Sequence, residues 1–180
     1  MFIQTEVTPN PNSLKFLPGR SVSNNGSFEV TKKEDTNNEL LKNILSINGV
    51  TGIFLGADFL SVNKKEEINW EDVKHIIISL INEFYSTGKE FIVVNEAHEE
   101  KNVEHNEIEK KIINILETKI RPAVAKDGGD IKFKEFKNGI VKVELQGSCS
   151  GCPSSTMTLK QGVENLLRHY LPEVKQVEAL

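Results

Sequence analysis

A charged segment near the middle of the sequence limits what this chain can fold into. Residues 96–106 read EAHEEKNVEHN, with few apolar side chains and no sustained helical or strand period. Such a composition is typical of a linker between domains. The 180-residue chain is therefore expected to form two small domains, residues 1–95 and residues 107–180, rather than one continuous core.

The first part of the sequence alternates between strand and helix patterns. Residues 2–7 and 14–17 predict two strands around the turn Pro9-Asn10-Pro11-Asn12, and a short helix and a hairpin over residues 52–63 follow. Apolar side chains then recur at three- and four-residue steps, which predicts one buried face of a helix ending near Ser86. The residues of that face are Trp70, Val73, Ile77, Leu80, Ile81 and Phe84.

The second part predicts helices at both ends of a hairpin. Proline disfavours a helical residue before it, so Arg121-Pro122 is expected to close or bend the first helix. Both parts predict α+β domains, and the second has the order α-β-β-α with a last short strand. Its predicted elements are a helix over residues 108–120, a turn over 127–130, a hairpin about Asn138-Gly139, a helix that Pro172 ends, and a strand over 174–177.

Charge and hydropathy exclude two classes of partner. The net charge is −4 and charges of both signs are interspersed, so no basic stripe for nucleic acid is expected. The longest apolar runs, such as residues 91–94, are far shorter than the roughly 20 residues that span a bilayer. No leader pattern follows Met1, which predicts a cytoplasmic protein of bacterial type, with a processed organellar protein as the alternative.

The two cysteines of the chain, Cys149 and Cys152, lie together in the sequence GSCSGCPSS. Two intervening residues let both sulfurs reach one metal, and Gly151 permits the tight backbone that this requires. Ser154 or Ser155 is expected to cap the following helix, whose dipole would then favour the thiolates that bind metal. Neither cysteine belongs to an apolar stripe. Chance seldom places the two cysteines of a chain together in a loop rich in glycine and serine before a helix, so the sequence predicts a metal site.

Counting ligands shows that this site is incomplete. Zinc sites and four-iron clusters commonly take four protein ligands, and the chain offers two cysteines, so a second copy is the simplest source of the others. A zinc site completed by His98 and His105 is one alternative, although six residues separate these histidines. A thiol-disulfide oxidoreductase and two structural cysteines without chemistry are the others. Against the oxidoreductase, the pair follows a hairpin and not the first strand of a parallel βαβ unit.

A family resemblance rests on longer stretches. The runs GSCSGCPSSTMTLKQGVENLLRHYLPEV and IRPAVAKDGGDIKF resemble the NifU-type C-terminal domain of iron–sulfur cluster carriers and scaffolds. The opening MFIQTEVTPNPNSLKFLPG, with GVTGIFLGADFLSVNK and INWEDVK, resembles the N-terminal domain of the Nfu subclass. The chain lacks the separate cysteine-bearing scaffold domain of longer NifU proteins, which favours a carrier.

The resemblance implies two small α+β domains and a four-iron four-sulfur cluster shared by two chains. Its ligands would be Cys149 and Cys152 of each chain in a homodimer. Such a protein is not an enzyme. It would receive the cluster from upstream assembly proteins and deliver it to apo iron–sulfur proteins, with the N-terminal domain recognising partners or tuning the dimer.

Several other residues have a simpler structural interpretation. Asp127 and Asp130 flank two glycines and are expected to serve the turn or cap rather than act as paired catalytic carboxylates. Lys160 is expected on a solvated surface, although it could offset the negative charge of a cluster. Trp70 is expected in the core, and the prolines of the 9–12 turn fit either a rigid turn or a partner-binding loop.

Overall fold

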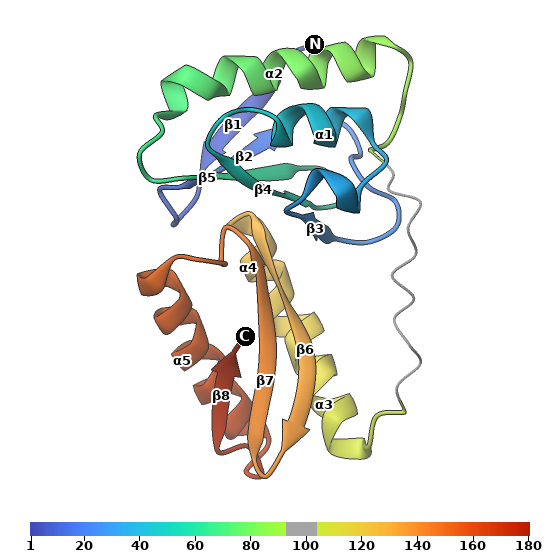
Figure 1. The fold of residues 1–180 in the computed structure, drawn as a ribbon. Helices are drawn as coiled ribbons and strands as arrows, with labels where there is room; N and C mark the ends of the chain where they lie inside the picture. The colour runs from blue at the N-terminus through green and yellow to red at the C-terminus, as the bar shows by residue number, and fades with distance from the viewer. Residues whose placement is uncertain (93–103) are drawn as a thin grey trace.

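The chain folds into two α+β domains, each with its own sheet and its own core (Figure 1). The computed structural model describes residues 1–92 and 104–180. This architecture confirms the predicted fold class. Most of the predicted linker, with His98, lies outside the described residues, so the exact domain boundaries stay a prediction.

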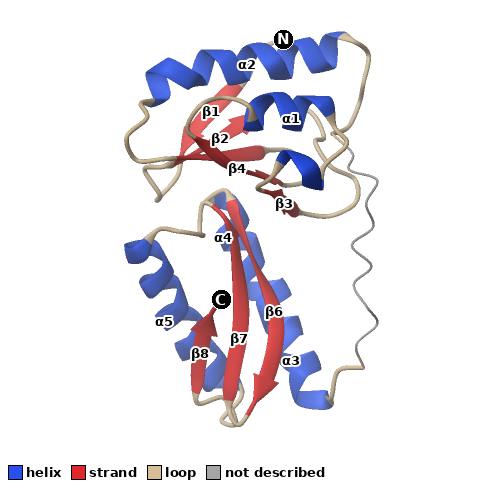
Figure 2. Cartoon of the chain, in the orientation of Figure 1, coloured by secondary structure: helices blue, strands red, loops and turns tan. Residues whose placement is uncertain are grey.

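The first domain is a five-stranded antiparallel sheet with helices on one face. The strand order is β1-β2-β5-β4-β3, and α1 and α2 cover the face that points away from the second domain (Figure 2). The elements are β1 (Gln4–Val7), β2 (Ser13–Leu17), β3 (Phe28–Val30), a 3-10 turn (Lys33–Asp35), α1 (Glu39–Leu45), β4 (Val50–Leu55), β5 (Leu60–Lys64) and α2 (Trp70–Ser86).

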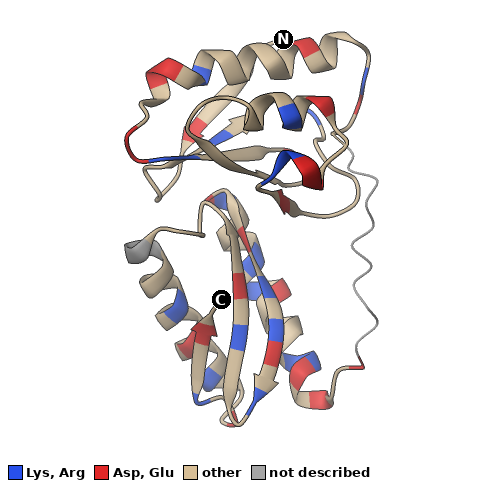
Figure 3. Cartoon of the chain, in the orientation of Figure 1, with Lys and Arg blue, Asp and Glu red and all other residues tan. Residues whose placement is uncertain are grey.

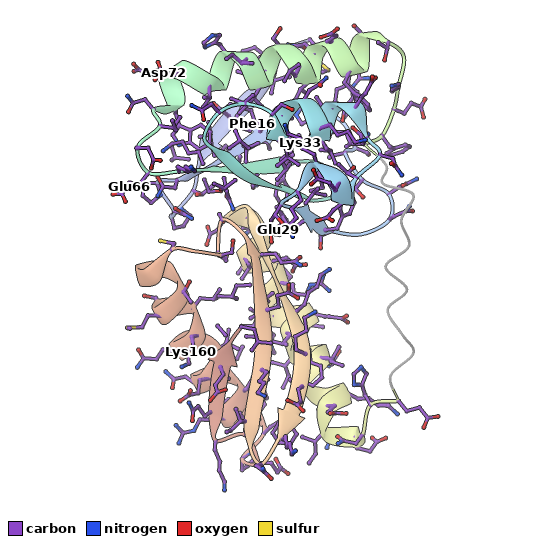
Figure 4. All side chains as sticks on the ribbon, in the orientation of Figure 1. Phe16, Glu29, Lys33, Glu66, Asp72 and Lys160 are labelled. Carbon is purple, nitrogen blue, oxygen red and sulfur yellow. The ribbon has the colours of Figure 1, made fainter. Side chains whose placement is uncertain are left out.

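The two faces of this sheet differ in chemistry because side chains alternate along each strand. One face carries apolar residues such as Phe16, which packs in the core beneath α1 and α2. The other face carries a row across four strands, in which Lys15 is paired with Ser61, Ser61 with Phe54, and Phe54 with Glu29. Glu29 lies at the side of the domain that faces the second domain (Figure 4).

The second domain packs helices against a three-stranded sheet of order β6-β7-β8, in which β7 and β8 are parallel. The predicted hairpin turn is confirmed, because Asn138 (φ 54°) and Gly139 (φ 79°) both adopt the left-handed conformation that this turn requires. The elements are α3 (Glu107–Ile115), a π-helical turn (Leu116–Ile120), α4 (Arg121–Lys126), β6 (Gly129–Lys137), β7 (Ile140–Gly147), α5 (Pro153–Tyr170) and β8 (Gln176–Ala179).

Of the two predicted effects of Arg121-Pro122, that it closes or bends the first helix of this domain, the structure excludes the first. The helix continues through the π-helical turn into α4, where Pro122 lies in the first turn. A proline is tolerated there because its missing N–H would have had no partner in the first turn. The last strand also begins two residues later than expected, at Gln176.

Charged side chains of both signs are spread over both domains (Figure 3). Within the two described ranges, no helix is both long enough and apolar enough to cross a bilayer. That the chain has neither a nucleic-acid nor a membrane partner stays a prediction.

Candidate metal centre

The cysteine loop, residues 147–152, joins the end of β7 to the start of α5. Gly147 (φ 67°) and Gly151 (φ 70°) both adopt the left-handed conformation, which L side chains rarely adopt. The Ser150 N–H donates to the Gly147 carbonyl at 3.2 Å, which closes a tight turn in this loop. The loop lies at the end of the second domain that faces the first (Figure 1).

Both cysteines are buried, each with 7% of its surface exposed. Cys149 packs in the core of the second domain, which corrects the expectation that neither cysteine contributes to a core. Its sulfur lies against Gly129, where an added Cβ would come within 2.7 Å of the Sγ. The hydroxyl of Ser148 is 3.9 Å from the same sulfur.

The start of α5 holds the second cysteine. Cys152 itself is the N-cap residue, so the prediction of a cap at Ser154 or Ser155 is wrong. Pro153 occupies the first helical position, for which its fixed φ is suited, and this places the cap one residue before the proline. The Thr156 hydroxyl donates to the Cys149 carbonyl at 3.2 Å and ties the helix to the loop.

The sequence predicted that the start of the helix would favour the thiolate form of the cysteines. For Cys149 this prediction is wrong. Burial raises its pKa to about 11, and the negative charges of Asp127 and Asp130 act in the same direction. The hydrogen bond from Ser148 opposes this rise but does not cancel it. Removal of the sulfur from water is the largest cause of the raised pKa, so the folded chain holds Cys149 protonated at neutral pH.

We expect Cys149 to react slowly with iodoacetamide. Relative to a thiol of pKa 9.0, a pKa of about 11 lowers the thiolate fraction at pH 8 roughly a hundredfold. The rate is measured in the Cys152→Ser variant, in which Cys149 is the one remaining thiol, with the same variant in urea as the control. Equal rates in the folded and unfolded chain would contradict the assignment.

Side chains of the first domain hold the backbone of the cysteine loop. The Asn10 amide donates to the carbonyls of Ser148 at 3.1 Å and Ser150 at 3.4 Å, and the Asn63 amide donates to the Gly147 carbonyl at 3.0 Å. The Gly147 N–H donates to the Glu29 carboxylate at 3.0 Å. Sequence reasoning missed all three side chains, and identified Asn10 only as a turn residue.

Asp130 is a buried structural carboxylate in β6 and not a turn or cap residue. Arg121 donates to both of its oxygens, at 2.9 and 2.8 Å, and the Ser27 hydroxyl of the first domain donates at 2.6 Å. Burial raises the pKa of Asp130, but these hydrogen bonds and the Arg121 charge outweigh burial and lower it. Asp127 remains in the predicted turn, where its backbone carbonyl accepts from the Ser148 hydroxyl.

The zinc alternative gains no support from the described residues. In residues 1–92 and 104–180, no group of three or more His, Cys, Asp or Glu side chains is arranged to hold a metal ion. His105 precedes α3, and its ring lies 5.5 Å from that of Phe133. Helix α3 begins at the end of the domain opposite the cysteine loop (Figure 1). Its proposed partner, His98, lies outside the described residues.

The oxidoreductase alternative meets a different objection from the one expected. Because β7 and β8 are parallel and joined by α5, the cysteine pair does lie between a strand and the helix of a parallel crossover. The topological argument against this alternative is therefore weaker than the sequence suggested. The raised pKa of Cys149 is the stronger objection, since disulfide exchange requires a reactive thiolate.

Two further residues are both half-buried, although Trp70 was expected in the core and Lys160 on a solvated surface. Trp70 packs against the core of the first domain and donates from its indole nitrogen to the Pro11 carbonyl at 3.0 Å. Trp70 therefore has a structural role, because it joins α2 to the turn that ends at Asn12. Lys160 is half-buried along α5, within the second domain (Figure 4).

Comparison with known proteins agrees with this architecture. Residues 3–88 match the family model described as scaffold protein Nfu/NifU N terminal, and residues 112–178 match the model described as NifU-like domain. NifU-like protein 4, mitochondrial, from Arabidopsis thaliana is 44% identical over 99% of this chain and 65% of its own length. The human NFU1 iron-sulfur cluster scaffold homolog, mitochondrial, is 42% identical over 99% of this chain and 71% of its own length.

A solution structure of a NifU-like protein from Saccharomyces cerevisiae is 27% identical, with a TM-score of 0.47, and covers 53% of this chain and 87% of that one. The two matched domains, in this order, define a scaffold protein of the NifU-like class. Within that class the chain belongs to the Nfu family.

Membership of this family bears on two further predictions. The relatives named above are mitochondrial proteins, so the prediction of a cytoplasmic protein is wrong. A scaffold family carries clusters and does not convert substrates, in agreement with the expectation that the chain is not an enzyme. The chain spans 65% of the length of the Arabidopsis relative.

Proposed function

We propose that this chain carries an iron–sulfur cluster and delivers it to apo iron–sulfur proteins. The observation that carries the proposal is the cysteine loop, residues 147–152, which holds both cysteines within six residues that include the left-handed Gly147 and Gly151. The human relative is named an iron–sulfur cluster scaffold, which supports the same role. On this proposal Cys149 and Cys152 are the cluster ligands.

The number of ligands supports a cluster shared by two copies of the chain. Each chain has two cysteines, and the described residues offer no larger group of metal ligands. Two-iron and four-iron clusters both take four thiolates, so two copies complete either site. Resemblance to the family favours the four-iron four-sulfur form in a homodimer.

Transfer would proceed by exchange of thiolate ligands. An incoming apo-protein replaces one cysteine of the carrier at a time, which requires that the cluster lie at an accessible contact between two chains. Upstream assembly proteins would supply the cluster by the same exchange in reverse. The protein therefore binds the cluster and releases it, and the cluster itself is not chemically converted.

Anaerobic reconstitution with iron and sulfide tests the proposal. We expect a visible absorbance band from thiolate bound to iron, with about two irons and two sulfides per chain. A colourless protein, or a protein that holds zinc alone after the same treatment, would contradict it. A colourless protein that reduces disulfides would favour the oxidoreductase instead.

A further inference from the structure

We propose that the first domain clamps the cysteine loop, and that this clamp must open before two chains can share a cluster. The inference rests on the proposed function, because it concerns access to the same cysteines. The surface of the first domain that forms the clamp comprises Asn10, Glu29, Phe54 and Asn63. The partner that this surface fits is the cysteine loop of the same chain.

Three side chains of the clamp form hydrogen bonds to the loop, and in each of these bonds the atom that the loop contributes is a backbone atom. Asn63 donates to the Gly147 carbonyl, and the Gly147 N–H donates to Glu29. Asn10 donates to the carbonyls of Ser148 and Ser150, which lie on either side of Cys149. The clamp therefore recognises the shape of the loop and fixes the backbone next to the first cysteine on both sides.

Phe54 fits the clamp closely to the loop. Phe54 is 1% exposed, and a Cβ added at Gly147 would lie 3.0 Å from its Cγ. Gly147 is required for its left-handed backbone, and a side chain there would meet Gly128 and Gly129 of its own domain, at 2.5 and 2.9 Å, as well as Phe54 of the first domain.

Hydrogen bonds to residues of the second domain outside the cysteine loop extend the interface between the two domains. The Lys15 ammonium donates to the Lys126 carbonyl at 3.3 Å, and Ser27 donates to the Asp130 carboxylate at 2.6 Å. The Lys132 ammonium donates back to the Ser27 carbonyl at 3.2 Å. Hydrogen bonds from β2 and from the segment before β3 therefore flank those to the loop.

The clamped arrangement and a shared cluster exclude one another. Four thiolates from two chains can meet only if both cysteines of each chain face the partner chain. Here each cysteine is 7% exposed, and the loop faces the first domain. Among the described residues, seven hydrogen bonds join the two domains, and water can replace them when the domains separate, so opening is accessible to the folded chain. Loading of the cluster is then coupled to domain opening.

Two isosteric substitutions open the clamp without removing side chains. Asn10→Asp keeps the oxygen that accepts from the Asn12 N–H at 2.9 Å, but replaces the donor to the loop with an oxygen. Asn63→Asp likewise replaces the amide nitrogen that donates to the Gly147 carbonyl with an oxygen. Carboxylates then face carbonyls, which opposes docking. Asn43→Asp on the exposed surface of α1 is the control, with the same change of charge per substitution.

The experiment measures the rate at which the cysteines of the full chain react with iodoacetamide in the absence of metal. The variant with both Asn10→Asp and Asn63→Asp is expected to react roughly tenfold faster than wild type, since three hydrogen bonds to the loop are lost. Asn43→Asp is expected to react as wild type does. The added negative charge would by itself lower the thiolate fraction, so it cannot account for an acceleration.

Equal rates in wild type and the double variant would overturn the proposal. If the double variant does not fold, amide hydrogen exchange of wild type decides, because the Gly147 N–H is held by Glu29 in the clamp. Protection of this amide supports the clamp, and exchange at the unfolded rate overturns it. Neither measurement uses iron, so a failure of the cluster proposal would be recognised separately, by reconstitution.

Discussion

Replacement of either cysteine by serine is expected to abolish cluster binding. A homodimer of Cys149→Ser or Cys152→Ser chains retains two of four thiolates, and a serine hydroxyl does not ionise at neutral pH to replace the others. The iron content after anaerobic reconstitution should fall from about two per chain to near zero, and the visible absorbance band should disappear. Iron and sulfide analysis of the desalted protein measures this loss.

A control within the loop separates loss of ligands from loss of structure. Ser150→Ala removes only a hydroxyl that donates to the Gly147 carbonyl at 3.0 Å, and should keep the iron content of wild type. Because Cys149 packs in a core, Cys149→Ser should also cost about 1–2 kcal/mol of stability. A serine variant that binds iron as wild type does would exclude that cysteine as a ligand.

Arg121→Ala is expected to destabilise the second domain by about 2–3 kcal/mol. The substitution leaves the Asp130 carboxylate, whose side chain is 6% exposed, without its two hydrogen bonds from the guanidinium. The estimate lies below the range for a fully buried pair because the Arg121 side chain is 35% exposed. Calorimetric unfolding, which can resolve the two domains, measures the change.

An exposed ion pair provides the control for this substitution. Arg168 lies 3.7 Å from Glu164 with 56% of its side chain exposed, and Arg168→Ala should change stability by at most about 0.5 kcal/mol. The pKa of Asp130 is lowered by folding, so its contribution is present above the unfolded pKa of about 4. That contribution is lost as the pH falls through the lower folded pKa. Equal losses in the two arginine variants would contradict the assigned role of Asp130.

Local patterns predicted the elements of each domain well. The helix from Trp70 to Ser86 follows from its apolar spacing, and the hairpin at Asn138-Gly139 follows from two residues that tolerate positive φ. The cysteine pair was identified because its members are neighbours in the sequence. Each of these predictions depends on residues only a few positions apart.

Interactions between distant segments could not be predicted in this way. Asn10 binds the cysteine loop 138 residues away, through carbonyl groups that every residue has, so no side-chain pattern in the loop indicates the contact. The protonation state of Cys149 was predicted wrongly for the same reason. The helix dipole is a local property, whereas burial, which raises the pKa of Cys149, arises from packing of the whole domain.

Native mass spectrometry of the anaerobically loaded protein tests most directly whether two chains share one cluster. The proposal predicts a species with the mass of two 20.2 kDa chains and one four-iron four-sulfur cluster, which a chelator of iron converts to species without the cluster. A single chain that holds a complete cluster by itself would contradict the proposal.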